Sequence, residues 1–297
     1  MIRRWLAVFM LLIFVTMVVA GCSKQSVKPA GQGGQKQTSS ASSPLTVKVL
    51  DIGQGDAILI RVAGQTVLVD SGDINTREKL VQYIKKEGIT TIDKVIITHP
   101  HADHLGGMPG VLDNFKVNQI YDSGQTTTTA LYRQYLTLVK KKEIPFTVLT
   151  AGTEIVITDD IKLKILAPEK PFITESELNN NSIVTKLVYN NFSMLLTGDA
   201  EKESENRMVK TYGNELKSTI LKVGHHGSNT SSSIEFLKIV APEAAIISLG
   251  ANNDYHHPHP STMKKLNEAK VKVYRTDTDG TVTVNSDGKT YTISKEQ

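Results

Sequence analysis

The eight histidines of this 297-residue chain lie in two short stretches, and the first stretch also carries an aspartate. It places His99, His101, Asp103 and His104 within six residues, directly after the apolar run 95–97. Histidine and aspartate at this spacing supply imidazole and carboxylate ligands from one loop, a set that suits a borderline metal such as zinc. The stretch therefore predicts a metal site rather than a solvated surface loop.

The N-terminus has the pattern of an export signal. Arg3 and Arg4 precede an apolar run, 5–20, which is shorter than the roughly 20 residues of a membrane-spanning helix. The run ends in small residues that lead into Cys22, the only cysteine of the chain, and this resembles a bacterial lipobox. We expect residues 1–21 to be a lipoprotein signal peptide and Cys22 to be a lipid anchor on the extracytoplasmic face of the cell membrane. A plain anchor helix and an ordinary cleaved signal peptide are the alternatives.

Composition separates a linker from a folded domain. Residues 22–44 are rich in Ser, Gly, Gln and Lys and bury too little apolar surface to fold, so they predict a flexible linker. Residues 45–297 are long enough for one layered α/β domain.

With one cysteine in the whole chain, this domain has no intramolecular disulfide and no thiolate metal site. The formal charge of +4 includes the two N-terminal arginines, so the mature chain is too mildly basic for composition to indicate a nucleic-acid partner.

Strand-like and helix-like stretches alternate along the predicted domain. The apolar periodicity predicts strands at 45–52, 93–98, near 147 and 155, and at 161–166, 219–223 and 244–249, hairpins at 57–69 and 182–196, and helices at 77–87, 131–142, 201–212, 232–240 and 261–269 with Ser261 as N-cap. Each ligand-rich loop follows a strand, which is where open sheets place their sites. Strands flanked by helices in two similar halves predict an α/β fold, a four-layer αββα sandwich.

Seven short segments match a pattern that one superfamily shows in the same order. They are DIGQGDA at 51–57, DSG at 70–72, the histidine motif at 98–104 with its glycines at 106–107, NNNS at 179–182, LTGD at 196–199, GHHGS at 224–228 and HPHP at 257–260. Together they resemble the metallo-β-lactamase superfamily, and within it the hydrolase-like domain of ComEC-type DNA-uptake proteins. The likeness covers residues 45–297 and implies the metallo-β-lactamase fold and a metal-dependent hydrolase.

The resemblance also implies two divalent metal ions. One ion is held by His99 and His101, a second by Asp103 and His104, and Asp199 bridges the pair through its two carboxylate oxygens. A hydroxide between metals about 3.5–4 Å apart is a nucleophile near neutral pH. Asp103 is also a candidate catalytic residue.

One departure from the family pattern concerns the first metal. Many members place a further histidine ligand before the bridging aspartate, but residues 105–198 contain none. Asparagines stand at 179–181 instead, and Asn181 is a candidate for the site loop. Because asparagine is a weaker, neutral ligand, the first site either binds loosely or selects a harder ion such as manganese over zinc.

The five later histidines divide into two groups. His225 and His226 are expected to point in different directions, so that only one is a ligand or proton donor. Both are candidate catalytic residues, and we favour His225 as the ligand because it is the first residue after the predicted strand and its glycine. Among the three histidines at 256–259, His257 best fits the closing metal ligand, and His259 is the next candidate for it. Those that are not ligands either are solvated or contact substrate, and His259 is also a candidate for the site loop.

Two further segments are candidates for shaping the site. Asp70 is expected to hydrogen-bond the motif loop from behind the ligands and fix its orientation, and a simple turn residue is the alternative. Gln54 and Asp56 lie in a Gly-x-Gly loop between two strands. Such a loop either contacts phosphate at the site or only turns the chain.

Three functions are compatible with these residues. The first is a phosphodiesterase or nuclease that acts on DNA or another phosphodiester outside the membrane, with a histidine such as His225 assisting the leaving group. The second is hydrolysis of a lactone, thioester or β-lactam on the same metal pair. The third is a non-catalytic accessory that binds metal or DNA during DNA uptake. We favour the first because phosphodiesterase branches of the resembled superfamily use an aspartate at the position of Asp199, where its β-lactamases often have cysteine.

Overall fold

The computed structural model describes residues 44–297 of the chain. The predicted signal peptide, Cys22 and the linker up to residue 43 lie outside the described residues and stay predictions. Within residues 44–297, none of the helices is both long and apolar enough to cross a lipid bilayer.

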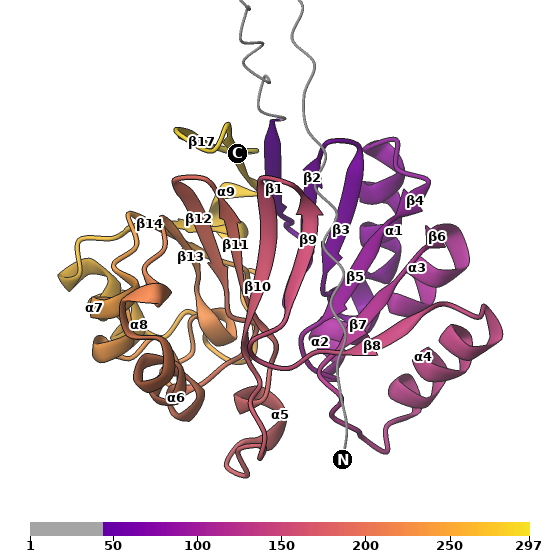
Figure 1. Cartoon of the computed structure of the whole chain (residues 1–297), viewed down its shortest axis with the longest axis horizontal. Helices are drawn as coiled ribbons and strands as arrows, with labels where there is room; N and C mark the ends of the chain where they lie inside the picture. The colour runs from indigo at the N-terminus through magenta and orange to yellow at the C-terminus, as the bar shows by residue number, and fades with distance from the viewer. Residues whose placement is uncertain (1–43) are drawn as a thin grey trace, which may run out of the picture. The chain divides into compact units, whose positions relative to one another are not determined.

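Two large β-sheets form the centre of the domain (Figure 1). In spatial order the first sheet contains β17 (Tyr291–Lys295), β16 (Val282–Ser286), β1 (Leu45–Val49), β2 (Ile58–Val62), β3 (Gln65–Val69), β5 (Lys94–Ile97), β7 (Ile120–Asp122) and β8 (Phe146–Val148). The four strands from β3 to β8 run parallel to one another, and the other neighbours pair antiparallel.

The second sheet has the same mixed character. In spatial order it contains β15 (Lys272–Arg275), β14 (Ala244–Ile247), β13 (Ile220–Lys222), β12 (Phe192–Leu196), β11 (Val184–Tyr189), β10 (Ile161–Ala167) and β9 (Glu154–Thr158). The strands from β12 to β15 are parallel, and those from β9 to β12 are antiparallel. A separate pair, β4 (Thr91–Ile92) and β6 (Lys116–Val117), is parallel.

Helices cover the outer face of each sheet (Figure 1). The first sheet is covered by α1 (Arg77–Lys86), α3 (Met108–Asn114) and α4 (Ala130–Lys141), and the second by α6 (Lys202–Tyr212), α7 (Ile234–Val240) and α8 (Pro260–Glu268). The shorter elements are α2 (Ala102–Leu105), α5 (Glu177–Asn180), α9 (Thr276–Asp279) and the 3₁₀ turns η1 (Ile74–Thr76), η2 (Gly213–Leu216) and η3 (Gly224–Gly227).

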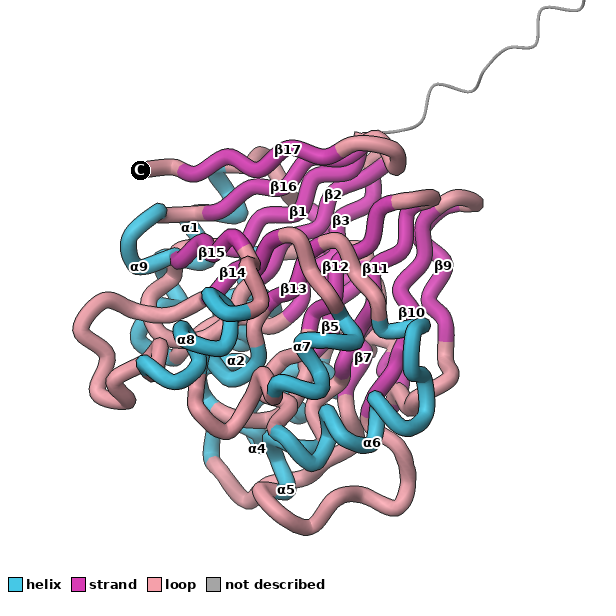
Figure 2. The backbone as a smooth tube through the Cα atoms, turned by 90° about the vertical axis from the view of Figure 1, so that its left-hand side faces the viewer, coloured by secondary structure: helices cyan, strands magenta, loops and turns pink. Residues whose placement is uncertain are grey.

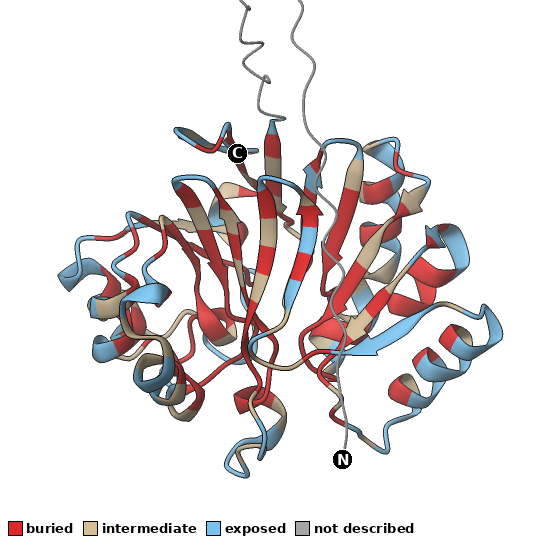
Figure 3. Ribbon diagram, viewed as in Figure 1, coloured by how far each residue is buried: buried red, intermediate tan, exposed pale blue. Residues whose placement is uncertain are grey.

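Three buried apolar clusters occupy the three interfaces of this arrangement, and buried residues alternate with exposed ones along the outer helices (Figure 3). In β5, Ile96 belongs to the cluster between the sheets, whereas Val95 and Ile97 belong to the cluster under α1, α3 and α4. In β13, Ile220 and Leu221 divide in the same way between the first and third clusters. Strands that are buried on both faces need a helix layer outside each sheet, so the predicted αββα sandwich is confirmed.

Most predicted elements lie within a few residues of the observed ones. The turn between β2 and β3 places Ala63 and Gly64 at φ of 51° and 78°, as a two-residue hairpin turn requires. The predicted start of the helix at 261–269 is wrong. The observed helix, α8, begins at Pro260, and its N-cap is His259 rather than Ser261. Proline favours the first helical position, where its missing N–H costs no hydrogen bond. The sequence patterns do not indicate β15, β16 or β17.

The loops that carry the site all follow parallel strands. Asp70 follows β3, the histidine motif follows β5, Asp199 follows β12, and the histidine pair follows β13. Because parallel strands end at the same edge of a sheet, these loops gather beyond one end of the sandwich, as Figure 2 shows.

Candidate metal centre

Four of the predicted site residues converge into one group, which we call cluster A. It consists of Asp103 and His104 from α2, Asp199 from the loop after β12, and His226 from η3. The Nε2 atom of His226 lies 3.2 Å from Oδ2 of Asp103 and 3.4 Å from Oδ1 of Asp199. Nε2 of His104 lies 3.2 Å from the same Asp199 oxygen. One ligand atom of each residue therefore lies within 4.8 Å of the other three.

The two imidazoles of cluster A turn their lone pairs toward each other. Nδ1 of His104 bonds to Oδ2 of Asp70 at 2.8 Å, and Nδ1 of His226 donates to the carbonyl oxygen of Ser248 at 2.9 Å. With the proton on Nδ1, each neutral ring presents an unprotonated Nε2, and these two atoms are 3.3 Å apart. Lone pairs at this distance repel unless a cation lies between them. The geometry therefore fits a metal ion coordinated by both rings.

A second group, cluster B, shares Asp199 with cluster A. Nε2 of His99 lies 2.9 Å from Nδ1 of His101 and 3.7 Å from Oδ2 of Asp199. Burial lowers the pKa of His99 well below its usual value, so the ring stays neutral, as metal binding requires. Asp199 thus presents Oδ1 to cluster A and Oδ2 to cluster B. Its Oδ1 atom is buried and accepts no hydrogen bond from the described residues. Metal ions bound by Asp199 would give this oxygen a partner.

The electrostatic field of the centre favours positive charge. Burial alone lowers the pKa of His226, but Asp199 and Asp103 overcome this effect and raise it to about 10. Burial is likewise outweighed at His104, whose pKa is raised well above its usual value by Asp199, Asp70 and Asp103. The pKa of Asp199 is held well below its usual range by His104 and His226, against the effect of burial. A divalent cation supplies the charge that this arrangement stabilises.

The donor set fits two divalent metal ions of unequal environment. Imidazole nitrogen and carboxylate oxygen are ligands of both zinc and manganese. Within the described residues, cluster A offers four side chains and cluster B offers three. Cluster B therefore leaves a coordination position for water or substrate.

Asn180 and Asn181 do not supply the missing ligand, and the prediction of Asn181 as a site residue is wrong. The Asn181 side chain accepts from the backbone N–H of Ile173 and donates to the carbonyls of Ile173 and Glu177. Asn180 accepts from two backbone N–H groups at the start of α6. These amides hold α5 and its loop in place, because a carboxamide satisfies a backbone donor and acceptor together.

The backbone of η3 explains why the two adjacent histidines face different ways. His225 and His226 both adopt left-handed φ, 47° and 52°, which costs an L-residue roughly 1–2 kcal/mol. The turn directs His226 into the interior, where 1% of its side chain is exposed, and leaves 23% of the His225 side chain exposed. This corrects the predicted preference: His226, not His225, completes cluster A.

His225 is instead paired with an acidic residue that sequence reasoning missed. Its Nδ1 lies 3.2 Å from Oε1 of Glu201 and 3.1 Å from Oγ1 of Thr230, while its Nε2 lies 3.8 Å from Oδ2 of Asp199. Although burial opposes it, the hydrogen bond with His225 lowers the pKa of Glu201, so the carboxylate stays charged. The only local signal for Glu201 is its place two residues after Asp199.

Asp70 makes the contacts that the sequence predicts for it. It accepts from the backbone N–H of Thr98 at 2.8 Å and from the Thr98 hydroxyl at 2.7 Å, besides its bond to His104. Burial raises the pKa of Asp70, and His104 opposes this rise. One fully buried carboxylate thereby fixes both ends of the motif loop.

The 51–56 loop packs behind the metal centre, and its Asp56 side chain does not line the cleft. Asp56 is 1% exposed, and its Oδ2 lies 2.8 Å from Nζ of Lys222, which is fully buried. Its Oδ1 lies 3.5 Å from Nδ1 of His226. The proposed contact of Asp56 with substrate is therefore wrong, because the ion pair holds it in the interior. Gln54 does line the cleft, and its amide oxygen accepts from the N–H of Gly250.

The loop 250–259 corrects the second ligand prediction. His257 belongs to neither cluster, and its ring packs against that of His226 with centroids 6.2 Å apart and planes at 29°. Burial and the neighbouring histidines lower its pKa to about 4, so this ring is neutral. His259 accepts a hydrogen bond through Nδ1 from the backbone N–H of Asn229 and belongs to neither cluster. Cluster A already has its fourth ligand in His226, which leaves His257 to shape the cleft.

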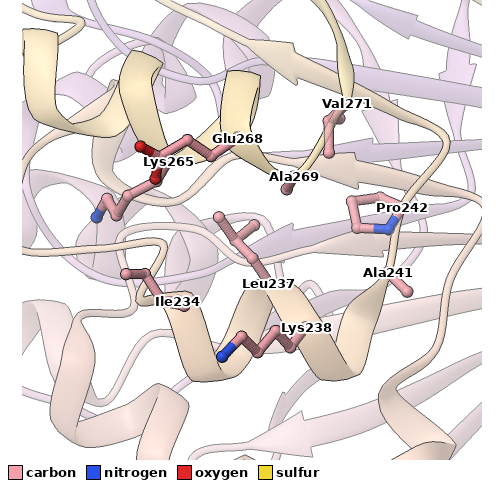
Figure 4. A pocket seen from close by; sticks show the side chains of 9 residues that line it. All are labelled: Ile234, Leu237, Lys238, Ala241, Pro242, Lys265, Glu268, Ala269 and Val271. Carbon is pink, nitrogen blue, oxygen red and sulfur yellow. The ribbon is translucent and has the colours of Figure 1, made fainter.

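A cleft of about 490 Å³ opens onto the two clusters. Its walls include His101, Asp103, Asp199, His225 and Tyr255. A second hollow, of about 450 Å³, lies between α7 and α8 and is lined mainly by aliphatic side chains with Lys238, Lys265 and Glu268 (Figure 4). The two clusters border the first cleft and not this second hollow, so the candidate metal centre belongs to the first cleft.

Comparison with known proteins identifies relatives of the chain. A family model described as "Metallo-beta-lactamase superfamily" matches residues 50–251. The chain is 32% identical over 259 residues to ComE operon protein 3 of Bacillus subtilis (strain 168) and 30% identical over 236 residues to Competence protein ComA of Neisseria gonorrhoeae. These matches cover 81% and 79% of this chain but 33% and 31% of the relatives, so the chain spans about a third of the length of the curated relatives it matches.

A solved structure shares the fold. The metallo-beta-lactamase fold protein YhfI from Bacillus subtilis superposes with a TM-score of 0.53 at 14% identity, covering 78% of this chain and 96% of that protein. At this identity the likeness concerns the fold alone.

Proposed function

The chain belongs to the metallo-β-lactamase superfamily, and from this premise we propose that it is a metal-dependent phosphodiesterase that cleaves DNA or a related phosphodiester. The family and the fold predicted from the sequence are both confirmed. The observation that carries the proposal is the buried carboxylate of Asp199, whose two oxygens face two separate histidine clusters. A carboxylate in this position would hold two metal ions at once, an arrangement that enzymes commonly use for hydrolysis at a phosphorus centre.

The chain's own residues prepare the centre for this chemistry. Two divalent ions held by clusters A and B would supply Lewis acidity toward a phosphoryl oxygen and a water that ionises near neutral pH. Asp70 and the Ser248 carbonyl hold His104 and His226 in the tautomer that leaves Nε2 free. The three-ligand cluster B borders the cleft through His101, so a phosphate has room beside it.

His225 is placed to protonate the leaving oxygen. Glu201 accepts a hydrogen bond from Nδ1 and fixes the orientation of the ring, while Nε2 points toward the Asp199 side of the cleft. When the bond from phosphorus to the leaving oxygen breaks, that oxygen takes the proton from Nε2, and solvent water restores it. The pair Glu201–His225 thus performs general acid catalysis. A strongly basic alkoxide leaving group needs this proton more than a weakly basic phenolate does.

The relatives support DNA as the phosphodiester, because one of them is named Competence protein ComA. We also propose the expected location at the outer face of the cell membrane. We propose that Cys22 carries the lipid anchor. Radioactive palmitate is expected to label the chain in cells and not to label Cys22→Ala; equal labelling of both would refute the anchor.

The test of the proposed function uses the full chain loaded with zinc or manganese. Wild type is expected to cleave single-stranded DNA and bis-p-nitrophenyl phosphate. Glu201→Gln and His225→Gln are expected to lower kcat on DNA by about 10²–10⁴-fold. The loss should be much smaller on bis-p-nitrophenyl phosphate, whose leaving phenolate needs no proton, and metal content should stay unchanged in Glu201→Gln.

Two outcomes would contradict the proposal. Hydrolysis of nitrocefin or of a lactone, with no turnover of any phosphodiester by the metal-loaded chain, would favour the carbonyl substrates instead. Binding of DNA in a gel-shift assay without turnover in either metal would favour a non-catalytic accessory. Equal losses on DNA and on bis-p-nitrophenyl phosphate would remove the proton-donor role of Glu201 and His225 while leaving the phosphodiesterase intact.

A further inference from the structure

A run of three nearly parallel rings leads from cluster A to the mouth of the cleft. The first ring is the ligand His226, the second is His257, and the third is Tyr255. Their planes differ by 29° and then by 20°, with centroids 6.2 Å and 5.6 Å apart, which are distances of offset stacking. Exposure rises along the run from 1% to 9% to 61%. The outer face of Tyr255 is therefore available at the end of the run.

Tyr255 is exposed at the mouth of the cleft. Residues 44–297 contain seven large hydrophobic side chains that are exposed, and Tyr255 is the one among them that lines the cleft. Its loop is braced from within, because Asn253 bonds through its side chain to Gly250 and to both backbone groups of His257. The ring is thus held in position by packing on His257, and its free face is prepared to receive a flat apolar group.

The charges of the cleft indicate what kind of group this is. Its lining includes the carboxylates of Asp73 and Asp254 beyond the metal clusters, and it includes no lysine or arginine. Phosphates away from the metals therefore gain no cationic contact in the cleft, although cationic contacts supply most non-specific DNA binding. The exposed ring of Tyr255, which can contact a base, is therefore the main feature for binding at a distance from the metals.

We propose that Tyr255, stacked on His257, is a base-stacking subsite that selects single-stranded nucleic acid at this centre. This inference rests on the proposed phosphodiesterase function and names its substrate class. Aromatic side chains bind bases of any sequence through their faces, whereas a base inside a duplex has both faces covered by its neighbours. The two ring-to-ring steps place Tyr255 within about 12 Å of His226. A base on Tyr255 and a phosphate at the metals can then belong to one strand, a few nucleotides apart.

The experiment compares Tyr255→Leu, which keeps an apolar side chain, with Tyr255→Phe, which keeps the ring. The metal-loaded full chain is assayed on a deoxythymidine 12-mer and on an abasic 12-mer with the same phosphates. We expect wild type and Tyr255→Phe to prefer the 12-mer with bases, and the ratio of kcat/KM for the two substrates to fall about 5- to 100-fold in Tyr255→Leu, mainly through KM. We also expect the KM of wild type to change little between 50 and 200 mM salt.

Several results would overturn the subsite. An unchanged substrate ratio in Tyr255→Leu removes the role of the ring, and so does an equal loss in Tyr255→Phe. Preference of wild type for a duplex of the same sequence contradicts single-strand selection. If no phosphodiester is turned over, the proposed function fails, and the subsite is tested by binding alone. Quenching of a 2-aminopurine oligonucleotide by wild type but not by Tyr255→Leu then supports it, and equal quenching by both overturns it.

Discussion

The buried ion pair between Asp56 and Lys222 allows a prediction of stability with a stated size. Lys222→Met removes the cation and keeps an unbranched apolar side chain of similar length. Both partners are buried, at 1% and 0% exposure, and their charged atoms are 2.8 Å apart. Removing one partner of such a pair costs about 3–5 kcal/mol, because the other charge is left without compensation in the interior.

The structure places the expected cost in the middle of this range. Oδ1 of Asp56 is buried and accepts no hydrogen bond within the described residues, so Lys222 is the principal compensation of the carboxylate. The Nζ atom of Lys222 also donates to the carbonyl of Val223, and that carbonyl loses its side-chain donor in the variant. We expect Lys222→Met to lower the free energy of unfolding by about 4 kcal/mol. At roughly 2–4 °C per kcal/mol for a domain of this size, Tm falls by about 8–16 °C.

The assay is urea and thermal unfolding of the chain in a metal chelator, so that loss of metal does not contribute. The double variant Asp56→Asn/Lys222→Met is the control, because it removes both charges together. We expect it to recover more than half of the loss, since the cost arises from an unpaired charge rather than from lost packing. A loss below about 1 kcal/mol in Lys222→Met, or a double variant as unstable as the sum of the two single variants, would refute the reasoning.

Three further predictions address the centre and its surroundings. Asp199→Asn removes the charge shared by both clusters and is expected to lower the metal content, measured by plasma mass spectrometry, from about two ions per chain to well below one; retention of both ions would contradict the bridging role. Gly55→Ala places a Cβ 2.1 Å from the carbonyl oxygen of Asp103, so the loop that carries this ligand has to shift. We expect the variant to bind cobalt more than about tenfold more weakly in absorption titrations. Gly64→Ala is the control, because nothing lies within 4 Å of the added Cβ. Burial raises the pKa of Asp122 from 3.8 to about 6, so its contribution to stability is present at low pH and is lost as pH rises through 6. Asp122→Asn is therefore expected to stabilise the fold by up to about 3 kcal/mol at pH 8 and by little at pH 4; urea titrations that show the same gain at both pH values would contradict this.

The first half of the metal centre could be predicted because its ligands are contiguous. His99, His101, Asp103 and His104 follow one strand, and their spacing alone brings them to one loop. Asp70 and Asp199 each stand at the end of a predicted strand, where periodicity places them at one edge of a sheet. Their roles were expected from the resemblance to the metallo-β-lactamase superfamily, not from periodicity.

The second half could not be predicted from spacing. The choice between His225 and His226 depends on two consecutive left-handed residues, a backbone state that is uncommon for any residue other than glycine. The ring of His257 lies near cluster A without entering it, because His226 already occupies the fourth position. The distinction requires the positions of two loops that are more than twenty residues apart in the chain.

By itself, the sequence determined the fold class and the first ligand loop, because both depend on side-chain types at short range, which spacing and a period of two or 3.6 residues reveal. The roles expected of Asp199 and Asp70 followed from the likeness of short motifs to those of the superfamily. Only the tertiary structure decided that Asp56 lies buried against Lys222, that Glu201 stands behind His225, and that Tyr255 ends a stack of rings. These pairings join different strands and loops, and their effect depends on burial, because the same charges and rings in water would contribute little.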